Sequence, residues 1–107
     1  MTELAGALRE RVTIETRAND RDIIAGRILR WQYDGASWAA VAPVIPGEFN
    51  VADSASALPR WAVTMRKRDG ITQQTRLVWR GRFLNVRSVE SDPREPSRMI
   101  VRCEEAR

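Results

Sequence analysis

The chain of 107 residues contains no histidine, one cysteine and one lysine. Without histidine it lacks the commonest general base and the commonest metal ligand of proteins. Its single thiol, Cys103, has no second cysteine for a disulfide and is too little to build a thiolate zinc site. We therefore expect neither a metal site nor a bound cofactor.

Motifs of catalysis are also missing. The chain has no GxSxG sequence and no glycine-rich phosphate-binding loop. Its two acidic pairs are Asp20/Asp22, in a polar loop, and Glu104/Glu105, near the C-terminus, where carboxylates are normally solvated. The sequence therefore argues that the protein is not an enzyme.

No long apolar run is present. A transmembrane helix needs about 20 apolar residues, and no window of the chain approaches that. Residues 1–8 carry an acidic side chain and no basic one, unlike a secretory signal peptide. We expect no membrane contact, and a lone unpaired thiol fits a reducing cytoplasm.

Arginine, by contrast, is abundant. The formal net charge is +4, and Lys67 is the only lysine among 18 basic residues. Two interpretations stay open: the guanidinium fork suits phosphates and carboxylates, and a GC-rich genome also favours arginine over lysine. The arginines alternate with acids, as in Arg9-Glu10-Arg11, which is typical of a solvated surface and not of a dense basic patch.

Apolar and polar residues alternate along most of the chain, which predicts strands with one buried face. Val12 and Ile14 alternate with charged residues, and Asp34-Gly35 reads as a hairpin turn between two further strands. The strands on either side of this turn are 29–33 and 37–43. The remaining expected strands are 60–66, 77–79, 84–86 and 99–103. Six or seven short strands indicate an all-β fold, a small antiparallel barrel or sandwich.

Two segments depart from this alternation. Residues 3–10 predict a short N-terminal helical turn, with Leu4 and Leu8 on one face. Residues 44–59 contain two prolines and a glycine, and they exceed the usual connection in a compact domain. We expect one domain over residues 1–107, with 44–59 as a long inserted loop.

The sequence "LVWRGRFLNV", residues 77–86, predicts a tight hairpin with Arg80-Gly81 at its tip. The alternation then slips by one residue before Val89, which indicates a β-bulge. The hairpin therefore carries an arginine on each side of its glycine.

All four tryptophans lie on expected strands. Trp31, Trp61 and Trp79 share parity with aliphatic neighbours, which favours burial. The alternative function is a small nucleic-acid-binding barrel, in which tryptophans stack on bases and arginines contact phosphates. That alternative predicts one basic face, formed by Arg66, Lys67, Arg68, Arg80 and Arg82.

The order of short motifs resembles the head–tail joining proteins of long-tailed bacteriophages and gene transfer agents, also called head closure or stopper proteins. The motifs are "LRERVTI" at 8–14, "WAAVAP" at 38–43, a loop with Glu48, "RWAVTMR" at 60–66 and "RGRFLNV" at 80–86. They cover roughly residues 6–105.

This resemblance implies a structural protein in the neck of a virion or phage-like particle, assembled in the host cytoplasm. Family members form a homo-oligomeric ring, typically a dodecamer, below the portal and adaptor proteins. The ring closes the DNA channel after packaging and contacts a tail terminator or another tail protein. The resemblance also implies weak contact with DNA in the channel.

By position, the resemblance assigns the channel-side loop to residues 44–59. Candidate contacts in that loop are Glu48, Phe49, Asn50 and Asp53. Candidate interface residues toward partner proteins are Arg9, Arg11, Arg60, Arg80 and Arg82. The chain departs from the family twice: Arg80-Gly81 replaces the more frequent Asp-Gly turn, and Gly47 replaces an arginine before the loop glutamate.

Overall fold

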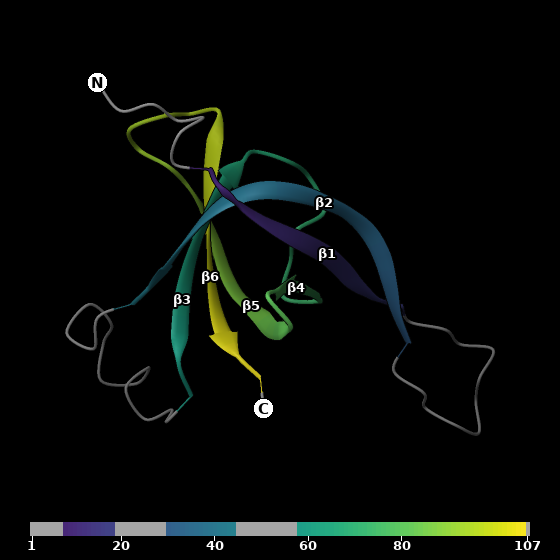
Figure 1. Ribbon diagram of the computed structural model, residues 1–107. Coiled ribbons are helices and arrows are strands. Elements are labelled where there is room, and N and C mark those ends of the chain that lie inside the picture. The colour runs from purple at the N-terminus through teal and green to yellow at the C-terminus, as the bar shows by residue number, and fades with distance from the viewer. Residues whose placement is uncertain (1–7, 19–29, 45–57, 107) are drawn as a thin grey trace.

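A computed structural model describes residues 8–18, 30–44 and 58–106, which form an antiparallel β-barrel (Figure 1). Its strands are β1 (Glu10–Ala18), β2 (Arg30–Pro43), β3 (Arg60–Arg66), β4 (Thr75–Trp79), β5 (Arg82–Ser91) and β6 (Arg98–Glu105). The strand order β1-β2-β3-β6-β5-β4 closes into a barrel because β1 also pairs with β4. The expected all-β fold is confirmed.

Apolar side chains from every strand fill the barrel, because alternate residues of a strand point to the same side. Eight of these side chains have no exposed surface: Val12, Ile14, Ala39, Val63, Met65, Leu77, Leu84 and Val101. The alternation read from the sequence therefore placed the core correctly on every strand except β2.

The dipeptide Asp34-Gly35 does not form the hairpin turn that we expected. Residues 30–43 are one continuous strand, β2, in which Ile14 pairs with Gly35 and Glu15 pairs with Tyr33. Asp34 is thus an extra residue, a bulge, and Gly35 has a φ of 120°. Because β1 pairs with β2 on both sides of this point, the turn signal produces a bulge within a long strand.

β2 pairs with β1 along its first part, residues 30–39, and with β3 along its last part, residues 39–43. Figure 1 shows β2 curving over the molecule beside β1. The strand ends at Pro43, where the sequence predicted its end.

The hairpin between β4 and β5 is confirmed. Arg80 and Gly81 have φ values of 50° and 77°, so both central residues of the two-residue loop are left-handed, as a type I′ turn requires. The expected slip before Val89 is also present: Val86 pairs with Cys103 and Ser88 with Arg102, which leaves one extra residue between them.

The expected helical turn at 3–10 is not supported in its described part. Leu8 and Arg9 are irregular, and Glu10 begins β1; residues 1–7 lie outside the described residues. Most of the loop 44–59 also lies outside them. Among the described residues, no helix is long and apolar enough to cross a membrane.

Candidate interaction surfaces

Two tryptophans meet beside the β4–β5 hairpin, and each donates a hydrogen bond to a carboxylate. The rings of Trp61 and Trp79 pack edge to face, with centroids 5.0 Å apart and an interplanar angle of 61°. The Nε1–H of Trp79 donates to Glu10 and that of Trp61 to Glu105, each at 2.9 Å. We call Glu10, Trp61, Trp79, Arg80, Arg82 and Glu105 the hairpin network.

Each carboxylate of the hairpin network also binds an arginine. Arg80 Nη2 lies 2.8 Å from Glu10 Oε2, and Arg82 Nη1 lies 3.7 Å from Glu105 Oε1. The Arg82 guanidinium carbon also lies 5.6 Å from the Trp61 centroid and 5.5 Å from that of Trp79. The Arg80 and Arg82 side chains remain 66% and 48% exposed, so the hairpin holds two guanidinium groups in place on the surface.

The other candidate interface arginines have different surroundings. Arg60 is only 12% exposed and lies 3.3 Å from Glu104, a carboxylate that Arg87 also binds at 3.3 Å. Little of Arg60 is left for contact with a partner. Arg9 and Arg11 are exposed, and Arg11 stacks on Trp38 at 5.2 Å.

Three aromatic residues of β2 share the outer face of the barrel. On β1, residues 11, 15 and 17 point outward because Val12 and Ile14 point inward. Their partners on β2 are Trp38, Tyr33 and Trp31, and cross-strand partners lie on the same face. Trp38 differs in parity from the other two, and the bulge at Asp34 brings all three to one face.

This placement corrects the expected burial of the tryptophans. Trp79 is buried and Trp61 packs partly buried against the core, as expected. Trp31 is only half-buried and lies on the outer face, because the bulge reverses its parity relative to Ala39 and Val41. Trp38 is 53% exposed.

Arg76 of β4 lies between two aromatic rings on this outer face. Its guanidinium carbon is 4.1 Å from the Trp31 centroid and 4.2 Å from the Phe83 centroid. Its Nε donates to Glu15 Oε1 at 2.7 Å. Arg17 contacts Trp31 as well, at 5.5 Å. Stacked guanidinium groups thus take the place of apolar side chains in covering Trp31.

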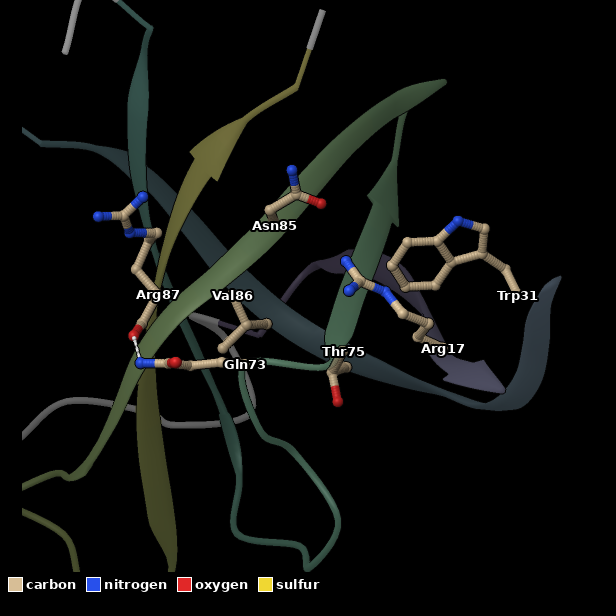
Figure 2. A pocket seen from close by; sticks show the side chains of 7 residues that line it. All are labelled: Arg17, Trp31, Gln73, Thr75, Asn85, Val86 and Arg87. Carbon is tan, nitrogen blue, oxygen red and sulfur yellow. Dashed lines mark hydrogen bonds between the residues drawn. The ribbon is translucent and has the colours of Figure 1, made fainter. Parts of the chain in front are cut away.

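A pocket of about 350 Å³ opens between the end of β1 and the middle of β5 (Figure 2). Its lining residues are Arg17, Trp31, Gln73, Thr75, Asn85, Val86 and Arg87. Gln73 Nε2 donates to the backbone carbonyl of Arg87 at 3.0 Å, which fixes one wall. Figure 2 shows the Arg17 side chain extending along Trp31 at the opposite wall.

The sequence did not identify this pocket. Trp31 belongs to a strand that the sequence predicted, but Arg17, expected at the start of a loop, lies near the end of β1. The partners across the pocket come from positions 73–87. No spacing within one strand signals such a contact, because it depends on β4 lying beside β1 in the closed barrel. Pocket prediction here required the strand order.

The basic face predicted for a nucleic-acid-binding barrel does not form. Arg66 lies at one end of the ladder between β3 and β6, and Arg60 lies at the other. Leu84 pairs with Glu105, which places the β4–β5 hairpin at the Arg60 end. Arg80 and Arg82 are therefore at the opposite end of β3 from Arg66, Lys67 and Arg68.

The described residues show no arrangement for metal binding or nucleophilic catalysis. They contain no group of three or more histidine, cysteine, aspartate or glutamate side chains placed to hold a metal ion. Cys103 is buried, and this burial raises the pKa of its thiol to about 12. A thiol with that pKa carries almost no thiolate at neutral pH, so it is a poor nucleophile.

The loop candidates Glu48, Phe49, Asn50 and Asp53 lie outside the described residues, as do Asp20 and Asp22. Glu104 and Glu105 are described, and both bind arginines: Glu104 binds Arg60 and Arg87, and Glu105 binds Arg82. Their role in the barrel is therefore that of ion-pair acceptors.

Comparison with known proteins gives a family and two similar structures. The family model described as phage head completion protein matches residues 4–106. A protein of Shigella flexneri 2a, solved in solution, is 26% identical with a TM-score of 0.77, and 97% of each chain is covered. No curated protein sequence matches this chain.

A chain from the virion of a native gene transfer agent particle is also similar. It is 17% identical with a TM-score of 0.69, and the match covers 92% of this chain and 96% of that one. At this identity the similarity shows a shared fold. The family match includes all six strands, so the chain belongs to the phage head completion protein family, whose members are virion structural proteins.

Proposed function

We propose that this protein forms a ring in the neck of a phage-like particle, where it closes the DNA channel and joins head to tail. The family match over residues 4–106 carries this proposal, because it includes every strand of the barrel. The similar fold of a chain in a gene transfer agent virion supports the location. The ring is a homo-oligomer, a dodecamer, with the portal or adaptor on one side and a tail protein on the other.

The hairpin network supplies a surface suited to such contacts. In a ring, each subunit meets its neighbours through two different surfaces that must complement each other. Arginine is enriched in protein interfaces, and Arg80 and Arg82 are exposed guanidinium groups already oriented by Glu10 and Glu105. Because they are held in place, little side-chain entropy is lost when a partner binds them.

In this proposal, the loop 44–59 faces the channel and Glu48, Phe49, Asn50 and Asp53 lie along the path of the DNA. The two strands that flank the loop are paired with each other: Pro43 of β2 is opposite Trp61 of β3. The ends of the loop are therefore anchored on adjacent strands of a rigid barrel. Such an anchor lets a loop project without disturbing the fold.

Electron microscopy of particles from a host with the gene disrupted tests the main proposal. We expect separate heads and tails, and heads that have lost their DNA. Intact, tailed, DNA-filled particles would refute the joining function. Complementation with the intact gene is the control, and it should restore tailed particles.

A second experiment tests the loop. Deleting residues 47–57 should leave a folded barrel, because the strands and the core lie outside this segment. Particles assembled with the deleted protein should leak DNA. DNA retention and normal infectivity in these particles would refute channel closure by the loop while leaving the joining function intact.

The alternative function is nucleic-acid binding, and the exposed ring of Trp38, with Arg11 5.2 Å from its centroid, favours it. Exposed aromatic rings beside guanidinium groups resemble surfaces on which bases stack. Purified protein would then bind single-stranded DNA with an affinity that falls steeply as salt rises. Absence of such binding at low salt would remove this alternative.

A further inference from the structure

We propose that the pocket beside Arg17, Trp31 and Asn85 binds an acidic side chain of a partner protein in the particle. This inference rests on the proposed function, since it requires a second protein next to the barrel. The partner is identified by its chemistry: an aspartate or glutamate presented by a chain other than this one.

The first observation is an unpaired cation on the pocket wall. No carboxylate of the described residues lies within ion-pair distance of the Arg17 guanidinium, which stacks on the Trp31 ring with its carbon 5.5 Å from the centroid. By contrast, Arg76 and Arg87, its neighbours on this face, bind Glu15 and Glu104. The donors of Arg17 are therefore free to bind a carboxylate with two parallel hydrogen bonds.

The second observation is the set of groups around this cation. The Asn85 side chain, which has no hydrogen bond within the described residues, supplies an amide that can donate to the same ligand. Trp31 offers an apolar wall for the methylene groups of an acidic side chain. Gln73 is bound to the Arg87 carbonyl, so the far wall is fixed. The pocket thus combines a cation, a polar donor and an apolar surface.

The charges around the pocket favour a single carboxylate over a nucleic acid. Duplex DNA carries one phosphate charge per about 1.7 Å of its axis, so it needs several cations in a row. Here the neighbouring guanidinium groups of Arg76 and Arg87 are already bound by Glu15 and Glu104, so they are less available to a row of phosphates. One unpaired guanidinium between two acids suits one isolated negative charge.

The charges of the chain favour a different protein over a second copy. The net charge is +4. Most carboxylates of the described residues already bind arginines of the same chain; these are Glu10, Glu15, Glu90, Asp92, Glu104 and Glu105. A chain of net positive charge, most of whose described carboxylates are already paired, suits the pocket of its own neighbour less well. An acidic partner complements it.

The test is an NMR titration of the purified chain with a blocked glycine peptide that carries one central glutamate. The glutamine version of the peptide is the neutral control. We expect saturable shifts of the Trp31 indole N–H and the Asn85 side-chain amide with the glutamate peptide alone. R17Q should weaken the affinity about threefold to tenfold, the effect of losing one charge-assisted contact at a partly exposed site. R94Q, which neutralises an exposed turn arginine remote from the pocket, should leave it unchanged.

Three results would overturn the inference: no shift at these two resonances, equal shifts with the glutamine peptide, or stronger binding of duplex DNA than of the glutamate peptide at the same resonances. If R17Q lowered the dispersion of the whole spectrum, the conservative variant N85A would replace it, with the same expected weakening. The titration uses the isolated chain, so its outcome is independent of whether the particle assays support the joining function.

Discussion

Glu10, the first residue of β1, accepts a hydrogen bond of 2.9 Å from the indole N–H of Trp79, which lies 69 positions further along the chain. The backbone ladder between β1 and β4 covers only Thr13 to Thr16 on the β1 side. The bond to Trp79 therefore extends the closure of the barrel beyond that ladder, to the base of the β4–β5 hairpin. It couples the seam of the barrel to the surface arginines of the hairpin network.

Replacing Trp79 by phenylalanine removes the donor to Glu10 and leaves an aromatic ring in the core. The Glu10 carboxylate would then lose a partner in a partly buried position, and the smaller ring would pack less fully. We expect the free energy of unfolding to fall by about 1–3 kcal/mol. Chemical denaturation followed by circular dichroism measures this change.

The matched control is W38F, because Trp38 is exposed and its indole N–H makes no hydrogen bond within the described residues. We expect the control to change the stability by no more than about 0.5 kcal/mol. Equal effects of the two substitutions would show that the Glu10–Trp79 bond does not stabilise the barrel.

Deleting Asp34 removes the bulge of β2. One half of the strand must then turn its side chains to the opposite face, so that either Trp31 and Tyr33 or Ala39 and Val41 are misplaced. We expect the free energy of unfolding to fall by about 3 kcal/mol or more, or the chain to fail to fold. Thermal unfolding and heteronuclear NMR spectra would report either outcome.

The substitution D34A is the control for this deletion, since it keeps the chain length and loses only the side-chain bond from Thr16, at 3.1 Å. D34A should lower the free energy of unfolding by less than about 1 kcal/mol. If the deletion were as mild as the substitution, the bulge would not determine which face the aromatic residues occupy.

Replacing Arg76 by lysine keeps the charge but loses the planar group that stacks between Trp31 and Phe83. Lysine still pairs with Glu15, so the loss reports on stacking. We expect the free energy of unfolding to fall by about 1 kcal/mol. R102K serves for comparison, because Arg102 binds Glu90 at 2.9 Å and stacks on no aromatic ring of the described residues. R102K should lower the free energy of unfolding by no more than about 0.5 kcal/mol. If R102K lowered it as much as R76K does, the stacking argument would be contradicted.

Cys103 should react slowly with a thiol reagent in the folded protein. Its thiol is buried, and burial raises its pKa to about 12, so both access and thiolate content are low. We expect labelling at least about a hundredfold slower than in the denatured chain. Rapid labelling of the native protein would contradict the placement of β6.

The same pKa predicts how stability depends on pH. Because the folded-state pKa is raised, the unfolded chain releases the Cys103 proton first as pH rises from about 9 to about 12. The contribution of Cys103 to stability is therefore complete below that pH range. Within the range, the free energy of unfolding falls by up to about 1.4 kcal/mol per pH unit. C103A should lack this part of the decline. Parallel slopes for the two proteins would contradict the raised pKa.

The amino-acid sequence by itself determined the core-facing residues of five strands, though not those of β2. Val12, Ile14, Leu84 and Val101 are all fully buried, as their alternation predicted, because a period of two needs only the local geometry of a strand. The hairpin at Arg80-Gly81 was also local, since a two-residue loop with glycine selects its own turn type.

Only the tertiary structure decided what Asp34-Gly35 does. The same dipeptide serves as a turn or as a bulge, and the outcome depends on β1 being long enough to pair with β2 on both sides of it. That choice in turn placed Trp31 and Trp38 on one outer face. The pairing of Glu10 with Trp79 and of Arg17 with its pocket likewise followed from β1 and β4 meeting at the seam. Contacts between distant residues depend on strand order, which short-range patterns do not contain.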